Sequence, residues 1–123
     1  DKKILIVDDS EIDLKLINKT LTNYNFTITQ CRSGSECIMK TIEDKYDLIF
    51  LDEVMPNLNG IETMENLKSI EDFKVPVILM TNKKAEQAQE LIKQNGFKAY
   101  LNKPLNKHKT DIILKGILNK KGD

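Results

Sequence analysis

The sequence predicts a doubly wound α/β fold, because short apolar segments alternate with stretches that have the periodicity of helices. Five segments are predicted strands, and they span residues 4–7, 26–29, 48–51, 77–80 and 99–101. Four of the five are nearly continuous apolar runs, as parallel strands are when helices cover both faces of a sheet. The connections are short enough that only right-handed crossovers are expected, so a helix should follow each strand.

Residues 26–29 alternate between apolar and polar side chains, which suits a strand at the edge of the sheet. Gly96 stands where a left-handed residue ends a helix. Capping pairs mark the starts of three helices: Ser10 with Asp13, Ser33 with Glu36 and, in a looser form, Asn59 with Glu62. Apolar stripes at helical spacing predict the buried helix faces: Leu14, Ile17 and Leu21; Ile61, Met64 and Leu67; Ala88, Leu91 and Ile92; and Ile112, Ile113, Ile117 and Leu118.

Composition and charge exclude several classes of protein. A chain of 123 residues with 40% hydrophobic residues predicts one domain, over residues 1–123, with a substantial core. Nineteen basic and nineteen acidic residues leave no net charge to attract nucleic acid or an anionic membrane. No apolar run approaches the ~18–20 residues of a membrane span, and no signal peptide opens the chain. We therefore expect a cytoplasmic domain without nucleic-acid or membrane contacts, in which Cys31 and Cys37 are reduced core thiols.

Polar side chains of matching chemistry follow four of the five predicted strands. In a doubly wound sheet the carboxyl ends of the strands form the edge at which ligands bind. Three carboxylates that meet there repel one another, and one should hold a proton unless a cation lies among them. Hard oxygen ligands without nearby His or Cys favour Mg²⁺ or Ca²⁺ over Zn²⁺, and the small number of protein ligands favours Mg²⁺. The residues concerned are Asp8, Asp9, Asp52, Thr81 and Lys103.

The same set of side chains suits a phosphoryl group. Thr81 offers a hydroxyl donor and Lys103 a mobile positive charge, which are common partners of phosphate oxygens. A carboxylate beside a divalent cation is a competent nucleophile at phosphorus and gives an acyl phosphate. Two acids could hold the metal while the third attacks. Its position on the central strand makes Asp52 the expected nucleophile.

At these residues the chain resembles the receiver domain of two-component signalling. The resemblance covers nearly the whole chain, from KILIVDDS through LDEVMPNLNGIE and VPVILMT to GFKAYLNKPL. It implies a flavodoxin-like three-layer sandwich, with five parallel strands in the order 2-1-3-4-5 and five helices. The resemblance also implies the roles of the site residues. Asp52 would be the phosphoacceptor, and Asp8, Asp9, Asp52 and the Val54 backbone carbonyl would bind the metal. Thr81 and Lys103 would contact the phosphoryl group, Thr81 and Tyr100 would form the switch, and Pro104 would follow a cis peptide bond.

The resemblance further implies a mechanism and its partners. A phosphohistidine of a sensor histidine kinase or phosphotransfer protein would donate its phosphoryl group to Asp52, with Mg²⁺ or a Mn²⁺ substitute. Self-phosphorylation and autodephosphorylation at Asp52 would follow the same chemistry. Thr81 would then swing toward the phosphate and Tyr100 inward. The surface of the fourth helix, fifth strand and fifth helix would change its preference for a downstream effector or an attached output domain.

Two further features concern the origin of the phosphoryl group and of the chain. His108, the only histidine, lies between lysines near the predicted start of the last helix, so the phosphoryl group should come from another protein. The chain begins with Asp1 rather than Met, which suggests a fragment. Its motifs resemble receivers attached to hybrid sensor kinases, whose kinase activity would lie outside these residues.

Three positions depart from the commonest receiver pattern. Glu53 stands where an apolar residue is frequent, and we expect its side chain to point into solvent. Asn82 replaces a small residue and would partly obstruct phosphodonors. Lys83, like Val54, occupies a position that in receivers influences how long the phosphoryl group survives. Whether the two residues together lengthen or shorten that lifetime is left open.

Three alternatives share the predicted architecture. A degenerate receiver could act as a docking module without phosphorylation, but all five key side chains are retained. A flavodoxin-like module for FMN or a nucleotide would need an anion cradle, but no Gly-rich loop follows the first strand. An aspartate-based phosphohydrolase would need a second acid two residues after the nucleophile, where this chain has Val54.

Overall fold

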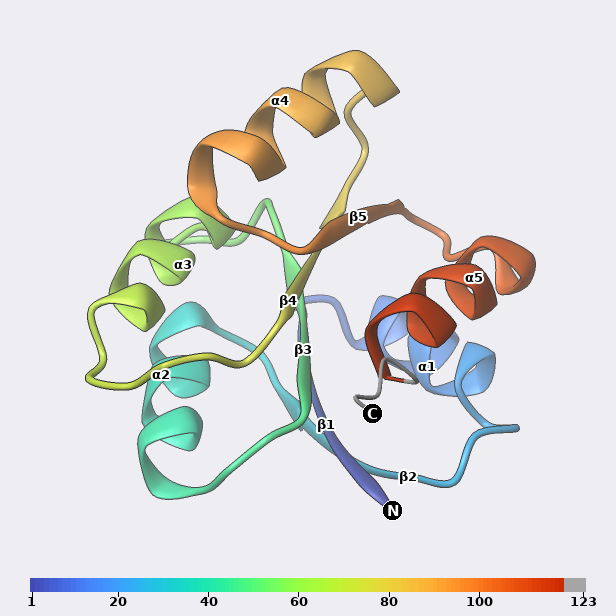
Figure 1. Cartoon of the computed structure of the whole chain (residues 1–123), viewed down its shortest axis with the longest axis horizontal. Helices are drawn as coiled ribbons and strands as arrows, with labels where there is room; N and C mark the ends of the chain where they lie inside the picture. The colour runs from blue at the N-terminus through green and yellow to red at the C-terminus, as the bar shows by residue number, and fades with distance from the viewer. Residues whose placement is uncertain (119–123) are drawn as a thin grey trace.

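The computed structural model describes residues 1–118, in which five strands form one parallel sheet in the order β2-β1-β3-β4-β5 (Figure 1). The predicted fold class and strand order are confirmed, and β2 lies at an edge as expected. The last five residues of the predicted domain 1–123 lie outside the described residues. In chain order the elements are β1 (Lys2–Val7), α1 (Glu11–Thr20), β2 (Phe26–Cys31), α2 (Gly34–Glu43), β3 (Leu48–Asp52), α3 (Gly60–Lys68), β4 (Val77–Thr81), α4 (Ala85–Asn95), β5 (Ala99–Asn102) and α5 (Lys107–Leu118).

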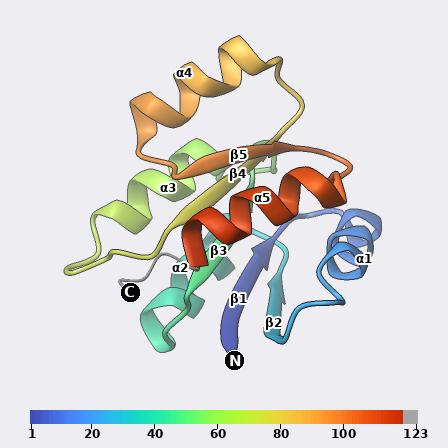
Figure 2. The same ribbon diagram turned by 45° about the vertical axis from the view of Figure 1, so that its right-hand side comes forward.

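The apolar runs of the inner strands are explained by helices on both faces of the sheet (Figures 1 and 2). Because successive side chains of a strand point to opposite faces, each run supplies two cores. Alternate residues such as Leu5, Ile49 and Leu79 pack on the face covered by α2 and α3. Their neighbours pack on the face covered by α1 and α5: Ile4, Ile6, Leu48, Phe50, Ile78 and Met80.

The helix ends follow the predicted signals, with three differences. Ser33 accepts a hydrogen bond from the Glu36 backbone N–H, but the Glu36 carboxylate accepts from the Arg32 backbone N–H rather than from Ser33. The Asn59 and Glu62 pair, predicted as a loose cap, forms a full reciprocal capping box. Ser10 accepts a hydrogen bond from the Asp13 backbone N–H, but the Asp13 carboxylate does not return it, because it binds a lysine instead. Gly96 ends α4 with φ +81°, as predicted.

The buried face predicted for the last helix is partly wrong. Ile112 is 57% exposed, whereas Thr110 and Leu114 are buried. The stripe of isoleucines is wide enough to wrap past the face that meets the sheet, so hydrophobicity alone does not mark its edge. Cys31 and Cys37 are buried free thiols, as predicted, and the hydrogen bond between them, together with burial, raises the pKa of Cys31. None of the helices in residues 1–118 combines the length and hydropathy that crossing a bilayer requires.

Candidate functional site

The predicted site residues meet at the carboxyl edge of the sheet. Asp8 follows β1, Asp52 is the last residue of β3, Thr81 is the last residue of β4, and Lys103 follows β5. The register pairs Asp52 with Met80, one residue before Thr81. Asp8 and Asp52 are almost completely buried, with 0% and 3% of their surface exposed.

The lysine holds three carboxylates together. The Lys103 ammonium lies 3.0 Å from Asp8 Oδ2, 3.0 Å from Asp52 Oδ1 and 2.9 Å from Asp13 Oδ2. Burial by itself would lower the pKa of Lys103, but the bonds to Asp13, Asp8 and Asp52 outweigh burial and raise it. Lys103 is therefore a firmly protonated cation at the centre of the site.

Lys103 offsets only part of the negative charge of the carboxylates around it. Burial, and then the charge of Asp8, raise the pKa of Asp52 to about 6, although Lys103 acts to lower it and Asp9 adds to the rise. Carboxylate oxygens of Asp8, Asp9 and Asp52 all lie within 4.8 Å of one another. Three hard oxygen donors at this spacing fit a divalent cation such as Mg²⁺, which would offset the remaining negative charge.

Asp13 belongs to this site, although the sequence pattern predicted for it only a place in a capping pair. Its carboxylate lies 2.9 Å from the Lys103 ammonium. The signal was available, because Asp13 lies in the first turn of the helix that directly follows Asp8 and Asp9. The Arg32 guanidinium also reaches this carboxyl edge of the sheet, called the rim below, where it donates to the Asp9 backbone carbonyl at 3.1 Å.

The expectation that Glu53 points into solvent is wrong. Its side chain is only 13% exposed, and its Oε1 accepts a hydrogen bond of 2.5 Å from the Thr81 hydroxyl. Its Oε2 lies 3.1 Å from the Lys83 ammonium. The sheet register explains these contacts: the Glu53 backbone N–H donates to the Met80 carbonyl, so Glu53 lies beside Thr81 on the neighbouring strand.

The loop after β3 returns so that the start of α3 packs closely against the end of that strand. The Gly60 N–H donates to the Glu53 carbonyl at 2.8 Å, and a Cβ on Gly60 would lie 2.3 Å from the Asp52 carbonyl oxygen. Glycine is therefore required where α3 begins against the end of β3. The Val54 side chain is 74% exposed, so this residue can offer its backbone without filling the site.

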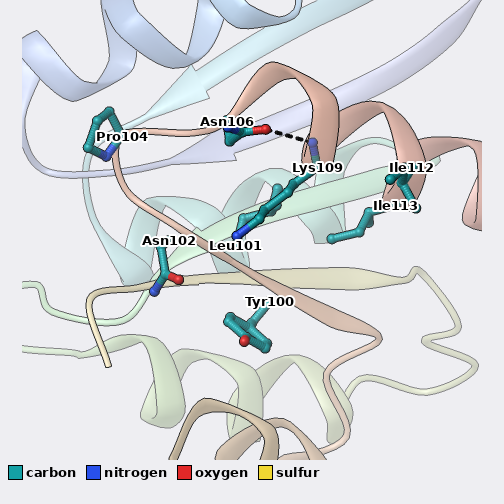
Figure 3. A pocket seen from close by; sticks show the side chains of 8 residues that line it. All are labelled: Tyr100, Leu101, Asn102, Pro104, Asn106, Lys109, Ile112 and Ile113. Carbon is teal, nitrogen blue, oxygen red and sulfur yellow. Dashed lines mark hydrogen bonds between the residues drawn. The ribbon is translucent and has the colours of Figure 1, made fainter. Parts of the chain in front are cut away.

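The remaining predicted residues lie around β5. The bond between Lys103 and Pro104 is cis, as the resemblance implies. Tyr100 is half-buried and lines a hollow between β5 and α5, whose lining includes none of Asp8, Asp9 and Asp52 (Figure 3). Asn82 and His108 are exposed. The structure thus brings together Asp8, Asp9, Asp52, Lys103 and, beside them, Thr81 with Glu53, while Tyr100 stands apart.

Comparison with known proteins identifies the class to which this fold and site belong. The chain belongs to the response regulator receiver domain family of two-component signalling, whose family model matches residues 4–115. The polar-differentiation response regulator DivK of Brucella ovis is 32% identical over 106 residues, covering 85% of this chain and 86% of that protein. The alkaline phosphatase synthesis transcriptional regulatory protein PhoP of Bacillus subtilis is 31% identical over 119 residues. The alignment covers 97% of this chain and 49% of PhoP.

Solved structures show the same fold. One is the receiver domain of sensor histidine kinase PA1611 from Pseudomonas aeruginosa, which holds a magnesium ion in its active site cleft. It matches with a TM-score of 0.86 at 24% identity, and the match covers 97% of this chain and 98% of that chain. The receiver domain of Ssk1 from Saccharomyces cerevisiae, solved with the histidine phosphotransfer protein Ypd1, has a TM-score of 0.85 at 22% identity, over 94% and 88%.

Proposed function

We propose that residues 1–123 form one receiver domain in which Asp52 accepts a phosphoryl group and thereby switches a binding surface. The observation that carries the proposal is the state of Asp52: it is 3% exposed, lies 3.0 Å from Lys103 and shares a 4.8 Å cluster with Asp8 and Asp9. A buried acid among other acids needs a cation, and a cation beside a carboxylate prepares it for attack on phosphorus.

The metal in this proposal is Mg²⁺, with Mn²⁺ as a substitute. Asp8, Asp9, Asp52 and the backbone carbonyl of Val54 would hold it, and the hard carboxylate oxygens of the cluster fit its preference. When bound, the ion supplies positive charge that offsets the carboxylates and the phosphoryl oxygens. The solved PA1611 receiver, which shares the fold, has a magnesium ion in its active site cleft.

The protein's own side chains provide the rest of the chemistry. A carboxylate oxygen of Asp52 forms the new bond to phosphorus, the bond from phosphorus to the donor nitrogen breaks, and its electron pair stays on that nitrogen. Lys103 pairs with the negative oxygens of the transferred group. Thr81 donates its hydroxyl to the acyl phosphate at Asp52. Water later attacks phosphorus, the bond from phosphorus to the Asp52 oxygen breaks with its electron pair on that oxygen, and inorganic phosphate leaves the regenerated carboxylate.

The proposed partners are a phosphodonor and a receiver of the signal. A phosphohistidine on a histidine kinase or phosphotransfer protein would donate in the cytoplasm. The complex of Ypd1 with the Ssk1 receiver supports this kind of partner, because that receiver shares the fold. The signal would leave by the face of α4, β5 and α5, where Tyr100 lines the hollow of Figure 3. It would reach a downstream effector, an output domain or the remainder of a hybrid kinase, with no nucleic-acid or membrane contact by this domain.

Intact mass spectrometry after incubation with acetyl phosphate tests the proposal. With Mg²⁺ the wild-type protein should gain the mass of one phosphoryl group, and with a chelator in place of the metal it should gain none. Asp52→Ala should remain unmodified under both conditions. A wild type that stays unmodified with Mg²⁺, or an equal adduct on Asp52→Ala, would show that this residue is not the phosphoacceptor and would favour a docking module without phosphorylation.

A further inference from the structure

One hydrogen bond beside the acidic cluster engages the hydroxyl that the proposed switch requires. The Thr81 hydroxyl donates to Glu53 Oε1 at 2.5 Å. Thr81 is 2% exposed and the Glu53 side chain 13%, so the bond is largely shielded from water. A hydrogen bond to a charged acceptor is stronger than one between neutral groups, and shielding from water preserves that strength.

Neighbouring groups hold both ends of this bond in place. The Lys83 ammonium lies 3.1 Å from the second oxygen of Glu53 and fixes the acceptor. The Lys83 backbone N–H donates to Thr81 Oγ1 at 3.1 Å and orients the donor. The side-chain amide of Asn102 donates to the backbone carbonyls of Thr81 at 2.8 Å and Lys83 at 3.0 Å, which ties this loop to β5.

A threonine hydroxyl carries a single proton, so it can donate only one such bond at a time. While Thr81 donates to Glu53, it cannot donate to a phosphoryl oxygen on Asp52. The exchange of acceptors is therefore an obligatory part of any switch that uses Thr81. The free energy of the bond to Glu53 is subtracted from the gain on phosphorylation.

We propose, on the basis of the proposed function, that Glu53 is a positioning residue that retains Thr81 in the unphosphorylated arrangement. Glu53 thereby sets how strongly a phosphoryl group on Asp52 shifts the protein toward the switched arrangement. Glu53 acts through the Thr81 hydroxyl and touches neither the metal nor the phosphoryl group in this role. Once the hydroxyl is released, Lys83 still neutralises the Glu53 carboxylate. At Glu53 and Thr81, the two arrangements therefore differ in which oxygen accepts the Thr81 hydroxyl proton.

Titration with Mg²⁺ and beryllofluoride, a mimic of the phosphoryl group, tests the proposal. Glu53→Ala should tighten the apparent affinity for beryllofluoride about tenfold, and Glu53→Gln, which keeps a neutral acceptor, about threefold. Glu65→Ala removes an exposed glutamate of α3 and should change nothing. Thr81→Val removes the hydroxyl at nearly constant shape, and in this background Glu53→Ala should change the affinity less than about twofold. Equal tightening with and without the hydroxyl would overturn the proposal, because charge repulsion alone would then explain it.

A second readout needs neither metal nor mimic. In the metal-free protein, three-bond NMR couplings should report one χ1 rotamer of Thr81 in the wild type and in Glu65→Ala, and rotamer averaging in Glu53→Ala. An unchanged Thr81 rotamer in Glu53→Ala contradicts the proposal. A wild type that takes up no beryllofluoride contradicts the proposed function itself, whereas normal uptake without any effect of Glu53→Ala refutes only the role of Glu53.

Discussion

At the scale of single residues, Asp52 is surrounded by more negative charge than its neighbouring ammonium offsets. Asp8, Asp13 and Asp52 share Lys103 at 2.9–3.0 Å, and Asp9 adds another carboxylate to the cluster. Burial and the charge of Asp8 therefore outweigh Lys103 and raise the pKa of Asp52 to about 6. Only the ionised carboxylate is a nucleophile, so a cation in this cluster would favour the reactive form.

The raised pKa predicts a pH-dependent effect of Asp52→Asn on stability. A folded-state pKa of about 6, above the model-compound value of 3.8, means that folding takes up protons between these values. The stabilisation from protonated Asp52 is complete at low pH and is lost as the pH rises through about 6. In chelator at about pH 7.5, Asp52→Asn should raise the free energy of unfolding by about 1–3 kcal/mol, and at about pH 4 the difference should fall to about 0.5 kcal/mol.

Urea unfolding of both proteins at the two pH values measures this effect. Glu65→Gln, on an exposed side chain, serves as the control and should show no pH-dependent difference from wild type. If Asp52→Asn destabilised the metal-free protein at the higher pH, the carboxylate would be favourably compensated by Lys103, and the need for a further cation would disappear.

The sequence predicted site residues well where they depend on strand ends and poorly where they depend on side-chain geometry. Asp8, Asp52 and Lys103 were identified because polar residues directly follow apolar runs, and the structure brings them together. Glu53 was interpreted as solvent-facing because the sequence, although it predicts that β4 lies beside β3, does not give the register between these two strands. With the strand order and register, its position next to Thr81 could have been inferred.

At the scale of elements, the start of α3 is built against the end of β3. Gly60 approaches the backbone of Asp52 and Glu53 so closely that a Cβ would lie 2.3 Å from one atom and 2.8 Å from another. Strand β3 and the loop after it supply Asp52, Glu53 and Val54, so the packing at Gly60 sets the position of three residues at the rim.

Gly60→Ala should therefore destabilise the protein by about 2–4 kcal/mol, because backbone atoms cannot yield as a flexible side chain would. Gly116→Ala is the matched control: it lies in α5, and within residues 1–118 nothing lies within 4 Å of its Cβ position. That variant should stabilise the protein by about 0.5–1 kcal/mol through helix propensity. Thermal and urea unfolding measure both variants, and a Gly60→Ala protein within about 0.5 kcal/mol of wild type would refute the tight junction.

The existence of the strands could be predicted from the sequence. Helices cover both faces of the inner strands, and each inner strand is therefore an unbroken apolar run. The exact edge of a buried helix face was less predictable. Ile112 belongs to an isoleucine-rich stripe but is 57% exposed, while the polar Thr110 is buried. Which residues of an amphipathic helix meet the sheet depends on the rotation of the helix, and hydrophobicity constrains that rotation only to within about a residue.

At the scale of the whole molecule, the parallel sheet makes the site. Each strand begins at one edge and ends at the other, so residues as far apart in the chain as Asp8 and Lys103 meet within 3.0 Å. Helices cover both faces of the sheet (Figure 1), and β1, β3 and β4 are buried up to their last residues. The site therefore lies at the carboxyl edge of the sheet, where Asp52 is 3% exposed, and under the proposed function a partner would deliver the phosphoryl group from this edge.

Site mapping of the acyl phosphate tests the central claim most directly. Protein incubated with acetyl phosphate and Mg²⁺ is reduced with borohydride, which converts a phosphorylated aspartate to homoserine, and is then digested and sequenced by mass spectrometry. If Asp52 is the phosphoacceptor, homoserine should appear at position 52 alone, and nowhere when the metal is chelated. Homoserine at Asp8, Asp9 or Asp13 with an unmodified Asp52 would refute this assignment.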